Sequence, residues 1–231
     1  MRRLAYTAVA LALLAGAAMA QVPSDRRNTR YAHAYDDPVD LLDQAGLCSW
    51  RISISTNNLL TPPQLEAMHD EIKRIFATAG QRIEFVQQDS DYALSVNARG
   101  ATYTKNDAAV GGTPYDHSTG IVSDQGRVFV DRLVASAHEH PLPLGETFDQ
   151  NLHFLGVGLG RAGSHEIGHY LLQQAYDSPS IHGVMHSGFS GADWFSRTSR
   201  GLWRFTWPQV LKLTQACIQQ KRIRLEQTPL P

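Results

Sequence analysis

The order of apolar and polar residues along this chain predicts a series of strands and helices. Residues 50–55 alternate apolar with polar side chains, which is typical of a strand with one buried face. Residues 82–86, 92–96 and 126–131 contain similar short apolar runs and are also expected to be strands. Between the first two strands, the apolar positions of residues 65–76 recur at helical spacing, after Thr-Pro-Pro and before a glycine.

This order of elements favours a single domain of the α/β (α+β) class. A strand–helix–strand unit normally places its two strands in parallel and side by side, so residues 50–55 and 82–86 should pair. Another helix is expected after the Thr-Trp-Pro sequence at residues 206–208. The sequence contains no internal repeat and no sign of a second domain. We therefore expect one mixed, twisted sheet packed on helices.

The N-terminal residues follow the pattern of a secretory signal peptide. A short basic region at residues 1–3 precedes an alanine-rich apolar run at residues 4–18, and Ala-Met-Ala at 18–20 matches a cleavage site. The run is too short for a good membrane span, so no stable membrane insertion is expected after cleavage, although an uncleaved anchor is the alternative. The predicted divisions are a signal peptide at 1–20, a flexible segment at 21–47, the folded domain at 48–225 and a tail at 226–231.

Charge and cysteine content narrow the partners and the compartment. Loss of Arg2 and Arg3 with the signal peptide leaves 19 basic and 22 acidic residues, a formal charge of −3. This balance gives no electrostatic reason to expect nucleic acid or anionic membranes as partners. Export to the periplasm or the medium would place Cys48 and Cys217 where a pair tends to be bridged, with two separate buried thiols as the alternative.

The residues that organise a functional prediction are His-Glu-Ile-Gly-His at 165–169, which match the His-Glu-x-x-His pattern of zincins. Residues four apart share one face of a helix, so His165 and His169 can direct two imidazoles at one metal ion. Glu166 lies one residue further round, where it can reach a water on that metal. The alternative is an amphipathic helix with two exposed histidines.

The sequence leaves the start of this active-site helix open. Gly156, Gly158 and Gly160 precede the motif, and glycine is a poor helix former. Either the helix starts late, near Leu159, or the small residues allow close packing against the sheet.

A catalytic zinc usually takes three protein ligands and keeps one position open. The strict metzincin pattern would need glycine and histidine where this chain has Leu172 and Ala175, so that pattern fails. Glu226 is the only glutamate after the motif, and it belongs to the predicted tail. The third ligand must therefore come from another residue.

The stretch from 159 to 185 resembles a group of small exported bacterial zincins related to metzincins. The resemblance rests on His-Glu-Ile-Gly-His-Tyr-Leu-Leu at 165–172, Asp-Ser-Pro at 177–179 and Gly-Val-Met at 183–185. It implies a single zincin-like catalytic domain, a Zn²⁺ cofactor and a peptide or protein substrate. It also implies that Met185 packs beneath the site as a Met-turn residue, although methionine also packs well in an ordinary core.

The resemblance departs from the group at the third ligand. Where the group has a histidine, this chain has Asp177, and an aspartate can also ligate zinc. Two further residues separate the Ser-Pro pair from the Gly-Val-Met turn, and one of them is His182. Asp177 is therefore the predicted third ligand, with His182 as its main alternative and His186 as a weaker one.

Other polar segments are expected to lie outside the metal site. Residues 98–125 are rich in glycine, threonine and aspartate, which is typical of loop and edge structure, and they could form the cleft rim that an extended peptide pairs with. Asp116 and His117 in that segment are expected to be solvated. His-Glu-His at 138–140 is expected to be a polar helix end.

The predicted function is an exported zinc-dependent metallopeptidase in which Glu166 is the general base. Two other functions stay open. The changed third-ligand region is compatible with a non-catalytic exported binding protein on a zincin scaffold, and the same chemistry would suit a zinc hydrolase of a non-peptide amide. The sequence assigns no oligomeric state.

Overall fold

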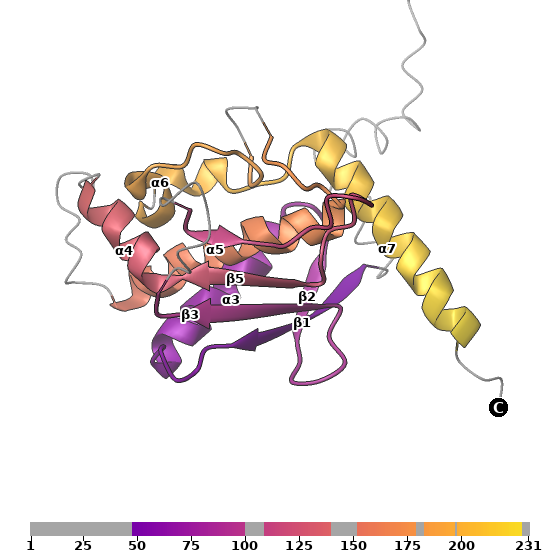
Figure 1. Cartoon of the computed structure of the whole chain (residues 1–231), viewed down its shortest axis with the longest axis horizontal. Helices are drawn as coiled ribbons and strands as arrows, with labels where there is room; N and C mark the ends of the chain where they lie inside the picture. Colours follow the sequence, from indigo (N-terminus) through magenta and orange to yellow (C-terminus); the bar gives the residue numbers. More distant parts are fainter. Residues whose placement is uncertain (1–47, 100–108, 140–151, 179–182, 197, 228–231) are drawn as a thin grey trace, which may run out of the picture. The chain divides into compact units, whose positions relative to one another are not determined.

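A five-stranded mixed sheet is the framework of the domain (Figure 1), and its strand order is β2-β1-β3-β5-β4. The computed structural model describes residues 48–99, 109–139, 152–178, 183–196 and 198–227. The predicted signal peptide, the flexible segment and His182 lie outside these residues. The strands are β1 Ser49–Ser55, β2 Arg82–Phe85, β3 Tyr92–Asn97, β4 Gly111–Gly112 and β5 Gln125–Phe129.

The one strand pairing that the sequence predicts, between residues 50–55 and 82–86, is present. β1 and β2 are parallel neighbours, joined through the helix α3, so the predicted strand–helix–strand crossover is confirmed. β1 and β3 are also parallel, as are β3 and β5. Short β4 is antiparallel to β5 and ends the strand order. The glycine-rich segment before residue 125 therefore supplies an edge strand.

Six helical segments complete the described domain, and the two shortest, at residues 191–195 and 198–202, were not predicted. They are α3 Pro62–Ala77, α4 Val130–Glu139, α5 Leu152–Leu172, α6 Gly191–Phe195, the 3-10 helix η2 Thr198–Leu202 and α7 Trp207–Gln227. The polar, glycine-bounded sequence of residues 191–201 predicts a loop. They form α6 and η2 instead. Ser190 caps α6, because its hydroxyl oxygen accepts from the backbone N–H of Asp193 and the carboxylate of Asp193 accepts from the backbone N–H of Ser190.

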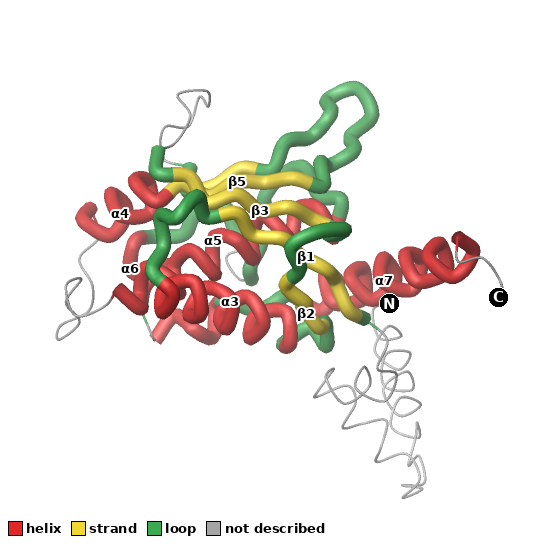
Figure 2. The backbone as a smooth tube through the Cα atoms, turned by 90° about the horizontal axis from the view of Figure 1, so that it is seen from below, coloured by secondary structure: helices red, strands yellow, loops and turns green. Residues whose placement is uncertain are grey.

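The core lies between one face of the sheet and the helices α3 and α5. Figures 1 and 2 show both helices on the same side of the strands. Alternation in β3 buries Tyr92, Leu94 and Val96 towards these helices, and the half-exposed residues between them face the other way. The apolar positions of α3 are buried in the same core, as their helical spacing predicts. This packing fixes α5, the helix that carries the metal-ligand motif.

Close contact with α3 settles the open question about the glycines of α5. The helix begins at Leu152, well before Leu159, so the glycines are helical. A Cβ on Gly156 would overlap the backbone carbonyl oxygen of Gln64, and one on Gly160 would lie 2.9 Å from that of Met68. The small residues therefore allow close packing, as the second alternative proposes, but their main partner is α3 rather than the sheet.

A disulfide joins Cys48 to Cys217, with their Cα atoms 5.6 Å apart and a separation of 169 positions in sequence. It ties the start of β1 to α7, as the cysteine pair predicts. The bond is consistent with an extracytoplasmic protein. Within the described residues, no helix combines the length and apolar character needed to cross a membrane.

We expect Gly156→Ala to lower the free energy of unfolding by about 1–3 kcal/mol, because α3 must move away from the added methyl group. The loss should appear although alanine favours a helix by about 1 kcal/mol over glycine. Gly163→Ala in the same helix is the control, since its Cβ would meet only the tip of Leu94 at 2.8 Å. Urea denaturation compares the two, and an equal effect of both variants would contradict this packing.

Candidate metal centre

The C-terminal half of α5 places His165 and His169 side by side. They are one helical turn apart, both are buried, and their ring centroids lie 4.7 Å apart in an edge-to-face arrangement. The predicted alternative of two exposed histidines is therefore wrong. Burial of two imidazoles is costly unless their nitrogen atoms find partners.

Each imidazole is oriented by a backbone carbonyl. Nδ1 of His165 lies 2.7 Å from the carbonyl oxygen of Val184, and Nδ1 of His169 lies 2.6 Å from that of Gln174. A carbonyl oxygen only accepts hydrogen bonds, so both Nδ1 atoms carry the proton. In the neutral rings, Nε2 therefore keeps its lone pair for a metal ion, in the way that ligand histidines are usually held.

Asp177 completes a triangle of ligand atoms. Its Oδ1 lies 3.0 Å from Nε2 of His165 and 3.1 Å from Nε2 of His169, and the two Nε2 atoms lie 3.1 Å apart. Ligands about 2.0–2.1 Å from a tetrahedral metal ion are separated from one another by about 3.3 Å. The three atoms therefore fit one face of such a coordination shell, and the group could bind a metal ion.

The structure brings together the three residues that the sequence names as ligands. Among the described residues, His165, His169 and Asp177 are the group of ligand-type side chains close enough to share a metal ion. His182 lies outside the described residues. His186 lines the same cavity, but it is not part of the triangle, and its buried Nδ1 has no hydrogen-bond partner among the residues that the structure describes.

The electrostatics of the triangle favour a cation. Burial opposes ionisation of Asp177, yet the imidazoles of His165 and His169, which donate to it and attract it when they are protonated, hold the pKa of that carboxyl well below its usual range. Burial would lower the pKa of His165, but the facing carboxylates of Asp177 and Glu166 raise it. The buried site thus holds negative charge that needs a positive partner, which can be a proton or a metal ion.

Glu166 lies beside the triangle and is buried. Burial raises the pKa of its carboxyl group, and the facing imidazoles of His165 and His169 oppose that shift. Its Oε2 accepts a hydrogen bond of 2.8 Å from the hydroxyl of Thr113, directly after β4. A buried carboxyl group with a raised pKa accepts a proton more readily than an exposed one.

The group opens into a cavity of about 710 Å³. It is lined by β4 with Thr113, and also by the aromatic residues Phe189 and Trp194. Tyr115 and Tyr176 stand at the mouth, where their hydroxyl groups lie 3.0 Å apart. Asp116 and His117 are exposed on the loop beyond, as predicted.

Met185 is buried against the motif helix. A Cβ on Gly168 would lie 2.5 Å from its sulfur atom, so the glycine between the two histidines makes room for it. The neighbouring Val184 provides the carbonyl that orients His165. The Gly-Val-Met segment thus supports the ligands from below the helix.

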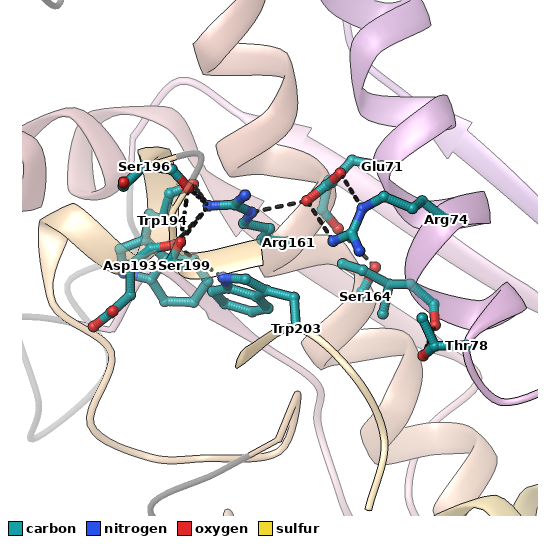
Figure 3. A network of polar contacts seen from close by, with 12 residues as sticks. Glu71, Arg74, Thr78, Arg161, Ser164, Asp193, Trp194, Ser196, Ser199 and Trp203 are labelled. Atoms are coloured by element: carbon teal, nitrogen blue, oxygen red, sulfur yellow. Dashed lines mark hydrogen bonds and ion pairs between the residues drawn. The ribbon is translucent and has the colours of Figure 1, made fainter. Parts of the chain in front are cut away.

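A buried arginine one turn before the motif fixes the wall of the cavity (Figure 3). Nε of Arg161 lies 2.8 Å from Oε1 of Glu71, and its Nη1 lies 2.7–3.1 Å from the carbonyl oxygens of Asp193, Trp194 and Ser196. Arg74 binds the same carboxylate, and both arginines hold the pKa of Glu71 low against the effect of burial. Arg161 therefore ties α5 to α3 and to the segment that presents Trp194.

Sequence reasoning missed Arg161, Thr113 and the aromatic wall. The one signal for Arg161 is a charged residue within an otherwise small and apolar helix, four positions before His165. Thr113 and Phe189 have no such signal, because both reach the site through loops. No protein-family model matches the sequence, and no curated protein matches it significantly.

We expect His165→Ala, His169→Ala and Asp177→Ala each to weaken metal binding by more than about 100-fold, because each removes one of three ligands. His186→Ala and His182→Ala are the controls and should bind the metal as the parent protein does. Calorimetric titration of metal into metal-free protein measures this. Retained affinity in Asp177→Ala, with a loss in either control, would contradict the assignment.

We expect Arg161→Ala to lower the free energy of unfolding by about 3–5 kcal/mol, because buried carbonyl groups and part of Glu71 lose their partner. Arg74→Ala is the matched control, because it also removes an arginine side chain that binds the carboxylate of Glu71. Its loss should be about 1 kcal/mol or less, since Arg74 is partly exposed and Arg161 still neutralises Glu71. Urea denaturation of the two variants side by side is the measurement, and equal losses would refute the central role of Arg161.

Proposed function

We propose that the protein is an exported zinc-dependent metallopeptidase that hydrolyses peptide bonds. The observation that carries the proposal is a buried carboxyl group, Glu166, placed beside a His–His–Asp triangle in the wall of an open cavity. The disulfide and the N-terminal pattern of the sequence support export. The proposal includes the relationship to exported zincins that the motif suggests.

The ligand set favours zinc among the common metals. Two imidazole nitrogens and one carboxylate oxygen suit Zn²⁺, and a catalytic zinc site has three protein ligands with one open position. When bound, zinc would supply a Lewis acid that polarises a carbonyl group and makes water more acidic. His165, His169 and Asp177 would hold it, and the carbonyl groups of Val184 and Gln174 would keep both imidazoles oriented.

Glu166 moves the proton in this proposal. Its carboxylate takes a proton from the attacking water and returns it to the nitrogen of the leaving amine. Burial, which raises the pKa of Glu166, makes its carboxylate a stronger base for the first of these transfers. Its Oε2 atom accepts the hydrogen bond from Thr113, which follows β4.

The edge of the sheet supports a peptide as substrate. β4 ends the strand order and lines the cavity, so an extended peptide could pair with its outer edge next to the metal ligands. Gly111 and Gly112 have no side chains to cover the backbone there. Peptide pairing would carry the scissile bond across the site in one defined direction.

The test is Glu166→Gln in the zinc-loaded, exported chain. We expect zinc content to stay the same and the rate of peptide hydrolysis to fall by about 10²–10⁴-fold, because the amide cannot accept the proton. Glu84→Gln is the control, a half-exposed glutamate of β2 that should leave the rate unchanged. Mass spectrometry of a peptide mixture measures cleavage.

Full activity in Glu166→Gln would refute Glu166 as the general base. Zinc binding without hydrolysis of any amide would favour a non-catalytic binding protein. Hydrolysis restricted to non-peptide amides would favour the other alternative, a zinc amidase.

A further inference from the structure

Thr113 is held between two buried polar side chains. Its Oγ1 lies 2.8 Å from Oε2 of Glu166 on one side and 2.9 Å from the hydroxyl of Tyr92 on the other. The three groups come from the rim after β4, the motif helix and the middle of the sheet. A continuous chain of hydrogen bonds therefore links β3 to the carboxyl group of Glu166.

The direction of these hydrogen bonds follows from the donors available. An ionised carboxylate only accepts, and a threonine hydroxyl has one proton, so Thr113 donates to Glu166. Tyr92 must then donate to Thr113. Burial raises the pKa of Tyr92, so its hydroxyl keeps the proton that this requires. Each member of the chain fixes the orientation of the next.

Two glycines make the arrangement sterically possible. A Cβ on Gly126 of β5 would overlap the hydroxyl of Tyr92 and would lie 2.8 Å from Oγ1 of Thr113. A Cβ on Gly111 of β4 would lie 2.5 Å from Oε1 of Glu166. The carboxyl group is therefore confined on both oxygens, by a hydrogen bond at Oε2 and by the backbone of the cleft rim at Oε1.

We propose that Tyr92 and Thr113 are positioning residues for Glu166, and that Gly111 provides the space in which its carboxyl group is aimed at the metal centre. The inference rests on the proposed function of Glu166 as general base. Thr113 occupies Oε2 so that the carboxyl group keeps one rotamer. Correct placement of a proton acceptor matters because a displacement of about 1 Å can cost about 100-fold in rate.

The first test compares Thr113→Val with Thr113→Ser in the zinc-loaded chain. Valine has the shape of threonine without the hydroxyl, and it should lower kcat by about 10–100-fold with KM and zinc content unchanged. Serine keeps the hydroxyl and should restore kcat to within about threefold of the parent value. Tyr92→Phe should lower kcat by a smaller factor, since it removes only the outer hydrogen bond.

A second readout does not depend on activity. In crystal structures of the metal-free variants, the Glu166 carboxyl group should keep its position in Thr113→Ser and change rotamer in Thr113→Val. Gly111→Ala should displace the same group from the opposite side. Thermal unfolding curves of all variants control for loss of the fold.

The outcomes separate this inference from the proposed function. An unchanged kcat and an unchanged Glu166 rotamer in Thr113→Val would overturn the positioning role, even if Glu166→Gln is inactive. A displaced carboxyl group in a chain without peptidase activity would keep the positioning role and refute the function. Failure of serine to rescue either readout would also overturn the inference.

Discussion

Three lone pairs point at one another in the wall of the cavity, and much of the surrounding structure holds them there. Nε2 of His165, Nε2 of His169 and Oδ1 of Asp177 lie 3.0–3.1 Å apart in pairs. Because both rings donate from Nδ1 to carbonyl groups, the inner atoms have no proton of their own to share when the rings are neutral. Such a group is stable only around a positive charge.

Several elements of the domain hold the three ligand residues in place. Glycines of α5 bring the motif helix into contact with α3, and Gly168 lets Met185 pack against the motif helix. Arg161 joins the same helix to the wall of the cavity through a buried ion pair with Glu71 and several carbonyl groups (Figure 3). A buried arginine is costly by itself, and here each of its hydrogen bonds also fixes part of the site.

Local patterns in the sequence predicted the parts of the site that depend on local geometry. Two histidines four residues apart share a helix face wherever that helix lies, so His165 and His169 could be named with Glu166. Alternation and helical spacing predicted β1, β3 and α3 for the same reason. Asp177 came instead from the resemblance, which supplied its distance from the motif. The Cys48–Cys217 pair followed from export and from the presence of only two cysteines.

Long-range geometry explains what the sequence could not predict. Thr113 meets Glu166 across 53 residues because β4 pairs with β5 at the edge of the sheet, and no local pattern encodes that register. The glycines of α5 were ambiguous because their partner, α3, lies about 90 residues earlier in the chain. Similarly, α6 was missed because it is only five residues long, too short to show a helical pattern of apolar residues. Its position also depends on the contact between Arg161 and Asp193.

The most direct test of this account is a crystal structure of the zinc-loaded chain with data collected on both sides of the zinc absorption edge. The account predicts one strong anomalous peak at bonding distance from Nε2 of His165, Nε2 of His169 and Oδ1 of Asp177. A peak coordinated by His182 or His186 in place of Asp177, or no peak at this position, would contradict it.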